Sequence, residues 1–159
     1  MNRLSTLSAI LVSAAALGLP GAALAATPQL FFAGDMVISP PEGSAGAHCV
    51  LASQFKHGDA VVFRVRVLNA SGDAVTDKDV KSLTVDLSSG ETFKMRYGGH
   101  PHDKPLDSFW SAAWKIPADF PSGSLSYKVV ATLPNGDTAD WAPFKVAPSQ
   151  LTILPGDDD

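Results

Sequence analysis

Residues 60–68, AVVFRVRVL, alternate apolar and charged side chains and decide the fold class. Phe63, Val65 and Val67 fall on one side of an extended chain and the intervening arginines fall on the other, because successive side chains of a strand point to opposite faces. A period of two predicts a strand with one buried face. The stretch NASGD at 69–73 follows it as a turn, since its residue types favour turn conformations.

The same alternation recurs along the chain at intervals of about ten residues. Further strands are predicted at 82–87, 91–97, 108–116, 124–133 and 140–146, with one more strand each within 29–34 and 48–55. The first two of these are joined by a Ser-Ser-Gly turn and form a predicted hairpin. No stretch sustains helical periodicity over three turns. Seven or eight short strands predict an all-β fold, an antiparallel β-sandwich.

Residues 114–146 carry a more specific pattern. A strand ends in Ile-Pro, a short loop carries Pro121 and Gly123, and Tyr127 lies early in the next strand. This resembles the late strands of immunoglobulin-like domains in bacterial exported proteins, where such a Tyr ties down the preceding corner. The resemblance implies an immunoglobulin-like sandwich. It is also similar in layout to small periplasmic domains that bind copper or sit on redox assemblies.

The first 25 residues have the features of a secretory signal peptide. An early Arg precedes an apolar run from Leu7 to Leu19, and small residues end in Ala-Leu-Ala, which predicts cleavage after Ala25. We therefore expect an exported, periplasmic protein, with secretion to the exterior as the open alternative. One domain is predicted over residues 26–154, and an acidic tail over residues 155–159.

Charge and cysteine content restrict the partners. The chain has 12 Lys and Arg against 16 Asp and Glu, a net charge of −4. This balance argues against nucleic acid or anionic lipid as a partner, since both reward clustered basic residues. No segment after the leader has the roughly 20 apolar residues that a membrane-spanning helix needs, so we expect no membrane insertion. One cysteine, Cys49, permits no intramolecular disulfide.

Two groups of residues are candidate copper ligands. His48 and Cys49 are adjacent, and adjacent strand residues point to opposite faces, so a buried Cys49 and a surface His48 are the favoured interpretation. His100 and His102 flank a proline, which favours an extended chain with both imidazoles on one side. Met95 has a thioether that suits copper, although its strand position predicts core packing. Copper is therefore a possible cofactor that the fold does not require.

Aromatic residues next to the histidines suggest a different function. Tyr97, Phe109 and Trp110 border the 101–107 loop, and alternation places Trp110 and Trp114 on one face and Phe109 on the other. Burial in the sandwich core is the favoured interpretation for the tryptophans. If Tyr97, Phe109 or Trp110 is exposed beside His100, a partner-binding surface becomes the favoured interpretation.

The chain has no nucleophile elbow, phosphate loop, CxxC or CxxCH motif, so we expect no enzyme activity. The function predicted from the sequence is an exported, noncatalytic binding module. It would dock on another extracytoplasmic protein or redox assembly through residues 97–114, and Tyr97, His100, His102, Phe109 and Trp110 are the predicted contact residues. The alternative function is copper binding or delivery through His100 and His102, with Met95, Cys49 and His48 as further ligands.

Overall fold

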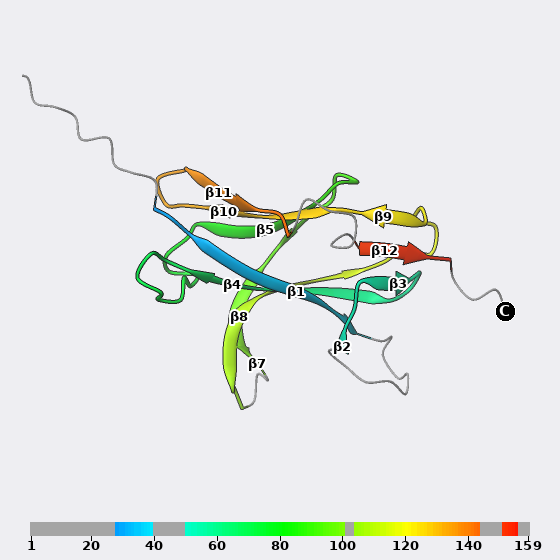
Figure 1. Cartoon of the computed structure of the whole chain (residues 1–159), viewed down its shortest axis with the longest axis horizontal. Coiled ribbons are helices and arrows are strands. Elements are labelled where there is room, and N and C mark those ends of the chain that lie inside the picture. Colours follow the sequence, from blue (N-terminus) through cyan, green and yellow to red (C-terminus); the bar gives the residue numbers. More distant parts are fainter. Residues whose placement is uncertain (1–27, 40–49, 101–103, 144–150, 156–159) are drawn as a thin grey trace, which may run out of the picture.

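The computed structural model describes residues 28–39, 50–100, 104–143 and 151–155. The predicted signal peptide and most of the acidic tail lie outside these residues. The described part is built from strands and turns alone, which confirms the all-β prediction, and none of it forms a helix long and apolar enough to cross a bilayer. The strands (Figure 1) are β1 Phe31–Ser39, β2 Val50–Leu51, β3 Gln54–Lys56, β4 Ala60–Leu68, β5 Ser82–Leu87, β6 Thr92–Lys94, β7 Arg96–His100, β8 Asp107–Lys115, β9 Gly123–Leu125, β10 Tyr127–Thr132, β11 Thr138–Trp141 and β12 Leu151–Leu154.

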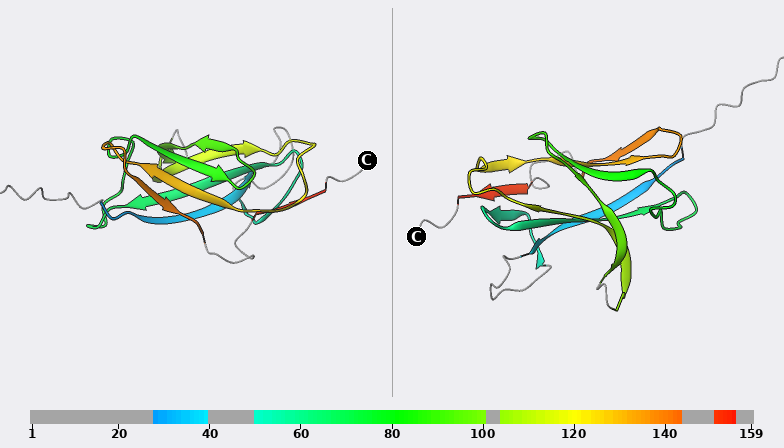
Figure 2. Two further views of the ribbon diagram at one scale, coloured as in Figure 1. Left: turned by 90° about the horizontal axis from the view of Figure 1, so that it is seen from above. Right: turned by 180° about the vertical axis from the view of Figure 1, so that it is seen from behind.

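The strands form three sheets. A five-stranded sheet has the order β2-β1-β4-β8-β7, and a four-stranded sheet has the order β11-β10-β5-β6. These two sheets lie over each other as layers, and the small sheet β3-β12-β9 spans the gap between them at one end (Figures 1 and 2). Neighbouring strands are antiparallel except β3 and β12, which are parallel. The architecture is sandwich-like.

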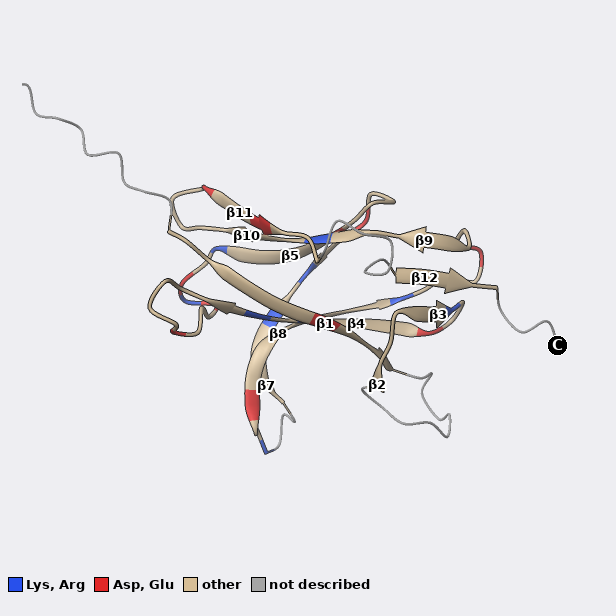
Figure 3. Cartoon of the chain, viewed as in Figure 1, with Lys and Arg blue, Asp and Glu red and all other residues tan. Residues whose placement is uncertain are grey.

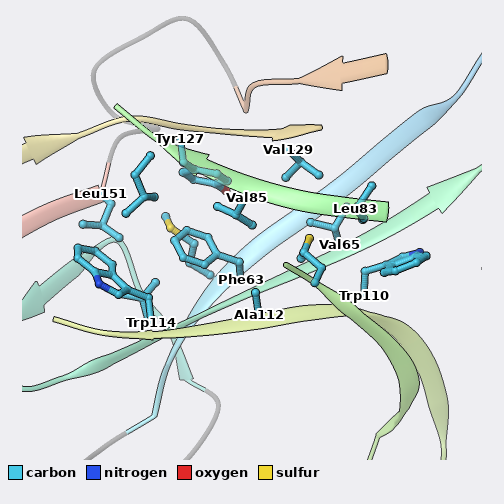
Figure 4. Close-up of a cluster of buried hydrophobic side chains, with 14 of the residues drawn as sticks. Phe63, Val65, Leu83, Val85, Trp110, Ala112, Trp114, Tyr127, Val129 and Leu151 are labelled. Atoms are coloured by element: carbon cyan, nitrogen blue, oxygen red, sulfur yellow. The ribbon is translucent and has the colours of Figure 1, made fainter. Parts of the chain in front are cut away.

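The core lies between the two layers and is formed by alternate residues of the facing strands (Figure 4). In β4 the buried positions alternate with partly exposed ones, as the sequence predicts for a strand with one buried face. Buried residues from the four central strands are Val61, Phe63, Val65 and Val67 of β4, Leu83, Val85 and Leu87 of β5, Trp110, Ala112 and Trp114 of β8, and Tyr127, Val129 and Ala131 of β10.

Three segments predicted as single strands are broken in the structure, which raises the strand number above the seven or eight expected. In the segment 48–55, β2 pairs with β1 and β3 pairs with β12. Within 91–97, β6 pairs with β5 in one layer and β7 pairs with β8 in the other. Met95 lies at the crossing, with its side chain only 1% exposed and its backbone N–H donated to the Leu83 carbonyl. The strand predicted at 124–133 breaks at Ser126, and its first part, β9, pairs with β12 instead.

The two layers also meet along β1 and β11. The Phe32 ring stacks on the Trp141 ring with centroids 6.3 Å apart. Gly34 makes room for this contact, because a Cβ at this position would lie 2.9 Å from the Arg64 carbonyl oxygen and 3.1 Å from the Trp141 ring. Glycine is therefore required here for close packing.

Candidate functional site

The predicted contact region forms a hairpin of β7 and the first half of β8, residues 107–111, which we call the β7–β8 arm. It curves away from the four-stranded layer and projects from the body of the sandwich (Figure 1). The strands pair antiparallel, with Gly98 opposite Phe109 and His100 opposite Asp107. Strand alternation places His100, Asp107 and Phe109 on the outer face of the five-stranded sheet. The His100 and Phe109 rings are in contact there, with centroids 5.5 Å apart.

Trp110 lies on the opposite, inner face of the arm. Its side chain is 3% exposed, and its indole Nε1 donates a hydrogen bond of 2.8 Å to the Val75 carbonyl. The Tyr97 ring packs against it at 5.5 Å and is half-buried. The core interpretation of Trp110 and Trp114 is confirmed. Burial removes Trp110 from the predicted contact residues, because a partner at the surface has no access to its ring.

The structure describes two of the five predicted copper ligands. Met95 is buried between the layers, whereas His100 is exposed on the outer face. These positions do not bring the two side chains together at one ion. His48, Cys49 and His102 lie outside the described residues. Within the described ranges, no three His, Cys, Asp or Glu side chains are grouped as metal ligands would be.

Ion pairs cross the outer face next to the arm. Arg64 donates two hydrogen bonds to the Asp35 carboxylate, at 2.6 and 2.7 Å, and its guanidinium lies 5.8 Å from the Phe109 ring centroid. Arg66 pairs with Asp107. These acids neutralise two of the basic residues that gather where β4, β8 and the β6–β7 segment cross (Figure 3).

Lys94 and Arg96 add two further cations to this face. Both side chains are exposed, and neither forms an ion pair in the part of the chain that the structure describes. They line a hollow of about 410 Å³ together with Gly98, His100 and Phe109. Among the residues that the structure describes, no carboxylate lines this hollow. The lining of the hollow therefore combines the basic side chains of Lys94 and Arg96 with the Phe109 ring.

Gly98 keeps the hollow open. A Cβ at this position would meet no atom within 4 Å, and the backbone is not in a left-handed conformation. A side chain therefore fits here without strain, but it would occupy space above the sheet beside Phe109. The neighbouring Gly99 differs, because a Cβ there would lie 2.6 Å from the Pro105 side chain. The first glycine leaves free space, and the second is required for packing of the loop.

Three exposed residues of this region were missed by the sequence analysis. Leu106, next to the tip of the arm, is 84% exposed, the largest exposure among the large hydrophobic residues of the described chain. The sequence feature that could have indicated its exposure is its position as an isolated apolar residue within the polar loop KPLD. Lys94 and Arg96 had a signal in the alternation of 92–97, which places basic residues opposite Phe93, Met95 and Tyr97. Their approach to Phe109 depends on strand pairing, which alternation does not reveal.

Comparisons of the chain with protein-family models, with curated proteins and with solved structures found no match. The chemistry of the site is consequently derived from its geometry. The site offers apolar contact at the exposed Leu106 and the half-buried Phe109, charge pairing at Lys94 and Arg96, and backbone groups along β7. These are the interactions by which proteins bind other polypeptides.

Proposed function

We propose that the protein is a noncatalytic binding module that docks on another extracytoplasmic protein through residues 97–114. The observation that carries this proposal is the exposure of Leu106 next to the tip of an arm that presents His100 and Phe109. The Leu106 N–H donates a 3.1 Å hydrogen bond to the His100 carbonyl, and the His100 ring contacts the half-buried Phe109 ring, so apolar and aromatic groups gather at this end of the sheet. Such a gathering of apolar groups at the surface is typical of a contact site. The docking residues are Leu106, His100 and Phe109, with Tyr97 supporting them from the inner face.

The described residues support protein docking better than they support copper delivery. Copper delivery through His100 would need ligands other than Met95, which is enclosed by the core. The docking surface uses the exposed Leu106 and His100 and the half-buried Phe109, whose ring contacts the His100 ring. We therefore propose protein docking as the function, and copper delivery has no separate support from the described geometry.

The proposed setting follows from the leader sequence and the fold. Residues 1–25 have the features of a cleaved signal peptide, so we place the protein in the periplasm. We also assign the sandwich to the immunoglobulin-like superfamily. Supporting this assignment are the two layers and the position of Tyr127 in the core, where its ring packs on Phe63 with centroids 5.0 Å apart.

Site-specific photo-crosslinking in the native envelope tests this function. A photoreactive residue is placed at Leu106, or as a matched control at Ser89, an exposed position in the β5–β6 turn. We expect a discrete crosslinked adduct from position 106 and none from position 89. The additional substitution Phe109→Ser should reduce the yield of that adduct. Equal adducts at both positions, or none at position 106, would contradict docking through the arm.

A further inference from the structure

We infer that the β7 edge of the arm accepts an extended, acidic segment of the partner as an additional strand. This inference rests on the proposed docking function and specifies the chemistry of the docked segment. Three features of the described residues carry it: an open sheet edge, cations with no acid beside them, and the empty space over Gly98.

The open edge supplies the backbone contacts. β7 is the last strand of the five-stranded sheet and pairs with β8 alone among the described strands. An edge strand presents N–H and C=O groups on its outer side, which an extended peptide can pair with. Exposed edges are commonly protected by proline, a bulge or a covering loop. The residues of β7, RYGGH, include no proline, and they pair with β8 in continuous register from Arg96 to His100.

Charge specifies the side chains of the docked segment. Arg96 and His100 lie on the outer face of β7, and Lys94 borders the same hollow, whose described lining includes no carboxylate. An acidic side chain directly across from a basic one on a neighbouring strand is stabilising, and a basic one is destabilising. The whole chain carries a net charge of −4, so the positive hollow is a local feature. It favours Asp or Glu opposite Arg96, and an imidazole N–H of His100 can donate a hydrogen bond to a second acid.

Gly98 specifies the residue between the two acids. Arg96, Gly98 and His100 are alternate residues of β7 and share its outer face. On the docked strand, one residue of the same face therefore lies between the two acids, and it lies opposite Gly98. Within the described residues, no atom lies within 4 Å of a Cβ built on Gly98, and Phe109 lies opposite it on β8. A large aromatic or aliphatic side chain covers such a glycine well. The expected pattern is acidic, any residue, aromatic, any residue, acidic.

Fluorescence anisotropy with labelled peptides tests this inference on the full mature chain. The probe is Thr-Glu-Thr-Phe-Thr-Glu-Thr, and the comparison peptides replace both Glu by Lys or replace Phe by Gly. We expect only the probe to bind, and not the comparison peptides. Added salt should weaken the binding of the probe, because exposed charges are screened. N-methylation of one alternate set of peptide amides should abolish binding, and N-methylation of the other set should preserve it, because a strand directs alternate amides to each side.

Variants of the protein locate the site. Gly98→Val should weaken peptide binding by more than about tenfold by filling the hollow, and Arg96→Gln by about two- to fivefold. Lys128→Gln, which removes an exposed cation from β10 in the other layer, is the matched control and should have no effect.

Several results would overturn the inference. The inference fails if the Lys peptide binds as tightly as the probe, or if N-methylation of the peptide does not change its binding. It also fails if Gly98→Val and Arg96→Gln bind the probe as the wild type does, or if millimolar inorganic phosphate alone displaces the probe. Self-association of the protein that Arg96→Gln abolishes would also overturn it, because the occupant would then be a second copy. If crosslinking at Leu106 succeeds while the peptides fail, docking stands and the acidic strand does not. If the peptides bind while crosslinking at Leu106 fails, docking through Leu106 is refuted and the peptide site stands.

Discussion

Replacing Trp110 by Phe should destabilise the sandwich although the residue lies in the docking region. The indole is 3% exposed and donates a hydrogen bond to the Val75 carbonyl, so it attaches the arm to the segment that follows β4. Phe keeps most of the apolar surface but loses the donor and part of the ring. The lost hydrogen bond costs about 1 kcal/mol, and the lost packing costs about 1 kcal/mol more. We therefore expect the free energy of unfolding to fall by about 2 kcal/mol.

Urea denaturation followed by far-ultraviolet circular dichroism measures this loss. For a domain of this size, a change of that magnitude lowers the midpoint by about 1 M urea. The matched control is Phe109→Leu, one position earlier on the same strand but on the outer face, where we expect a change below about 0.5 kcal/mol. A loss below 0.5 kcal/mol for Trp110→Phe, or a larger loss for the control, would refute the assignment of inner and outer faces.

Two other substitutions test the packing of the sandwich. Gly34→Ala should lower the free energy of unfolding by about 1–3 kcal/mol, because its Cβ would lie 2.9 Å from a backbone oxygen. The control is thermal unfolding of Gly98→Ala, whose Cβ meets no neighbour among the described residues; it should show no loss and a gain of up to about 1 kcal/mol, because alanine restricts the unfolded chain. The pKa of Tyr127 is raised to about 12, first by burial of the phenol and then by the negative Asp35. The neutral phenol is therefore favoured in the folded state, and its contribution is present below about pH 10 and lost as pH rises toward 12, by about 2–3 kcal/mol. Tyr127→Phe should reduce this alkaline loss in urea midpoints, and an unchanged alkaline loss would contradict the burial of the phenol.

Strict alternation explains which strands were predictable. β4 and β5 have the predicted bounds, because every second residue in them is buried. Alternation continues through Met95 in the segment 91–97, so it gives no sign that the chain changes sheets there. β12 was not predicted, although Leu151 and Ile153 alternate, because four residues are too few for periodicity to distinguish a strand from a loop.

Alternation also determines which part of the candidate site could be predicted from the sequence. Alternation correctly separated Phe109 from Trp110, since it depends on neighbours within one strand. It did not bring Arg96 to Phe109, because that proximity depends on the pairing of β7 with β8. Pairing across strands is a property of the whole fold. A surface made by several strands is therefore harder to predict than the direction of any one side chain.

The position of β12 has a consequence for biosynthesis. Its residues Leu151 and Ile153 are 1% and 2% exposed, and the strand pairs with β3 on one side and β9 on the other. A nascent chain that ends before residue 151 therefore leaves two strands without their shared neighbour and part of the core in water. Such contacts between distant segments form late, since the intervening chain must first be ordered. A chain truncated shortly before this strand therefore cannot complete the domain, because the apolar residues that β12 covers stay in water at that end of the sandwich.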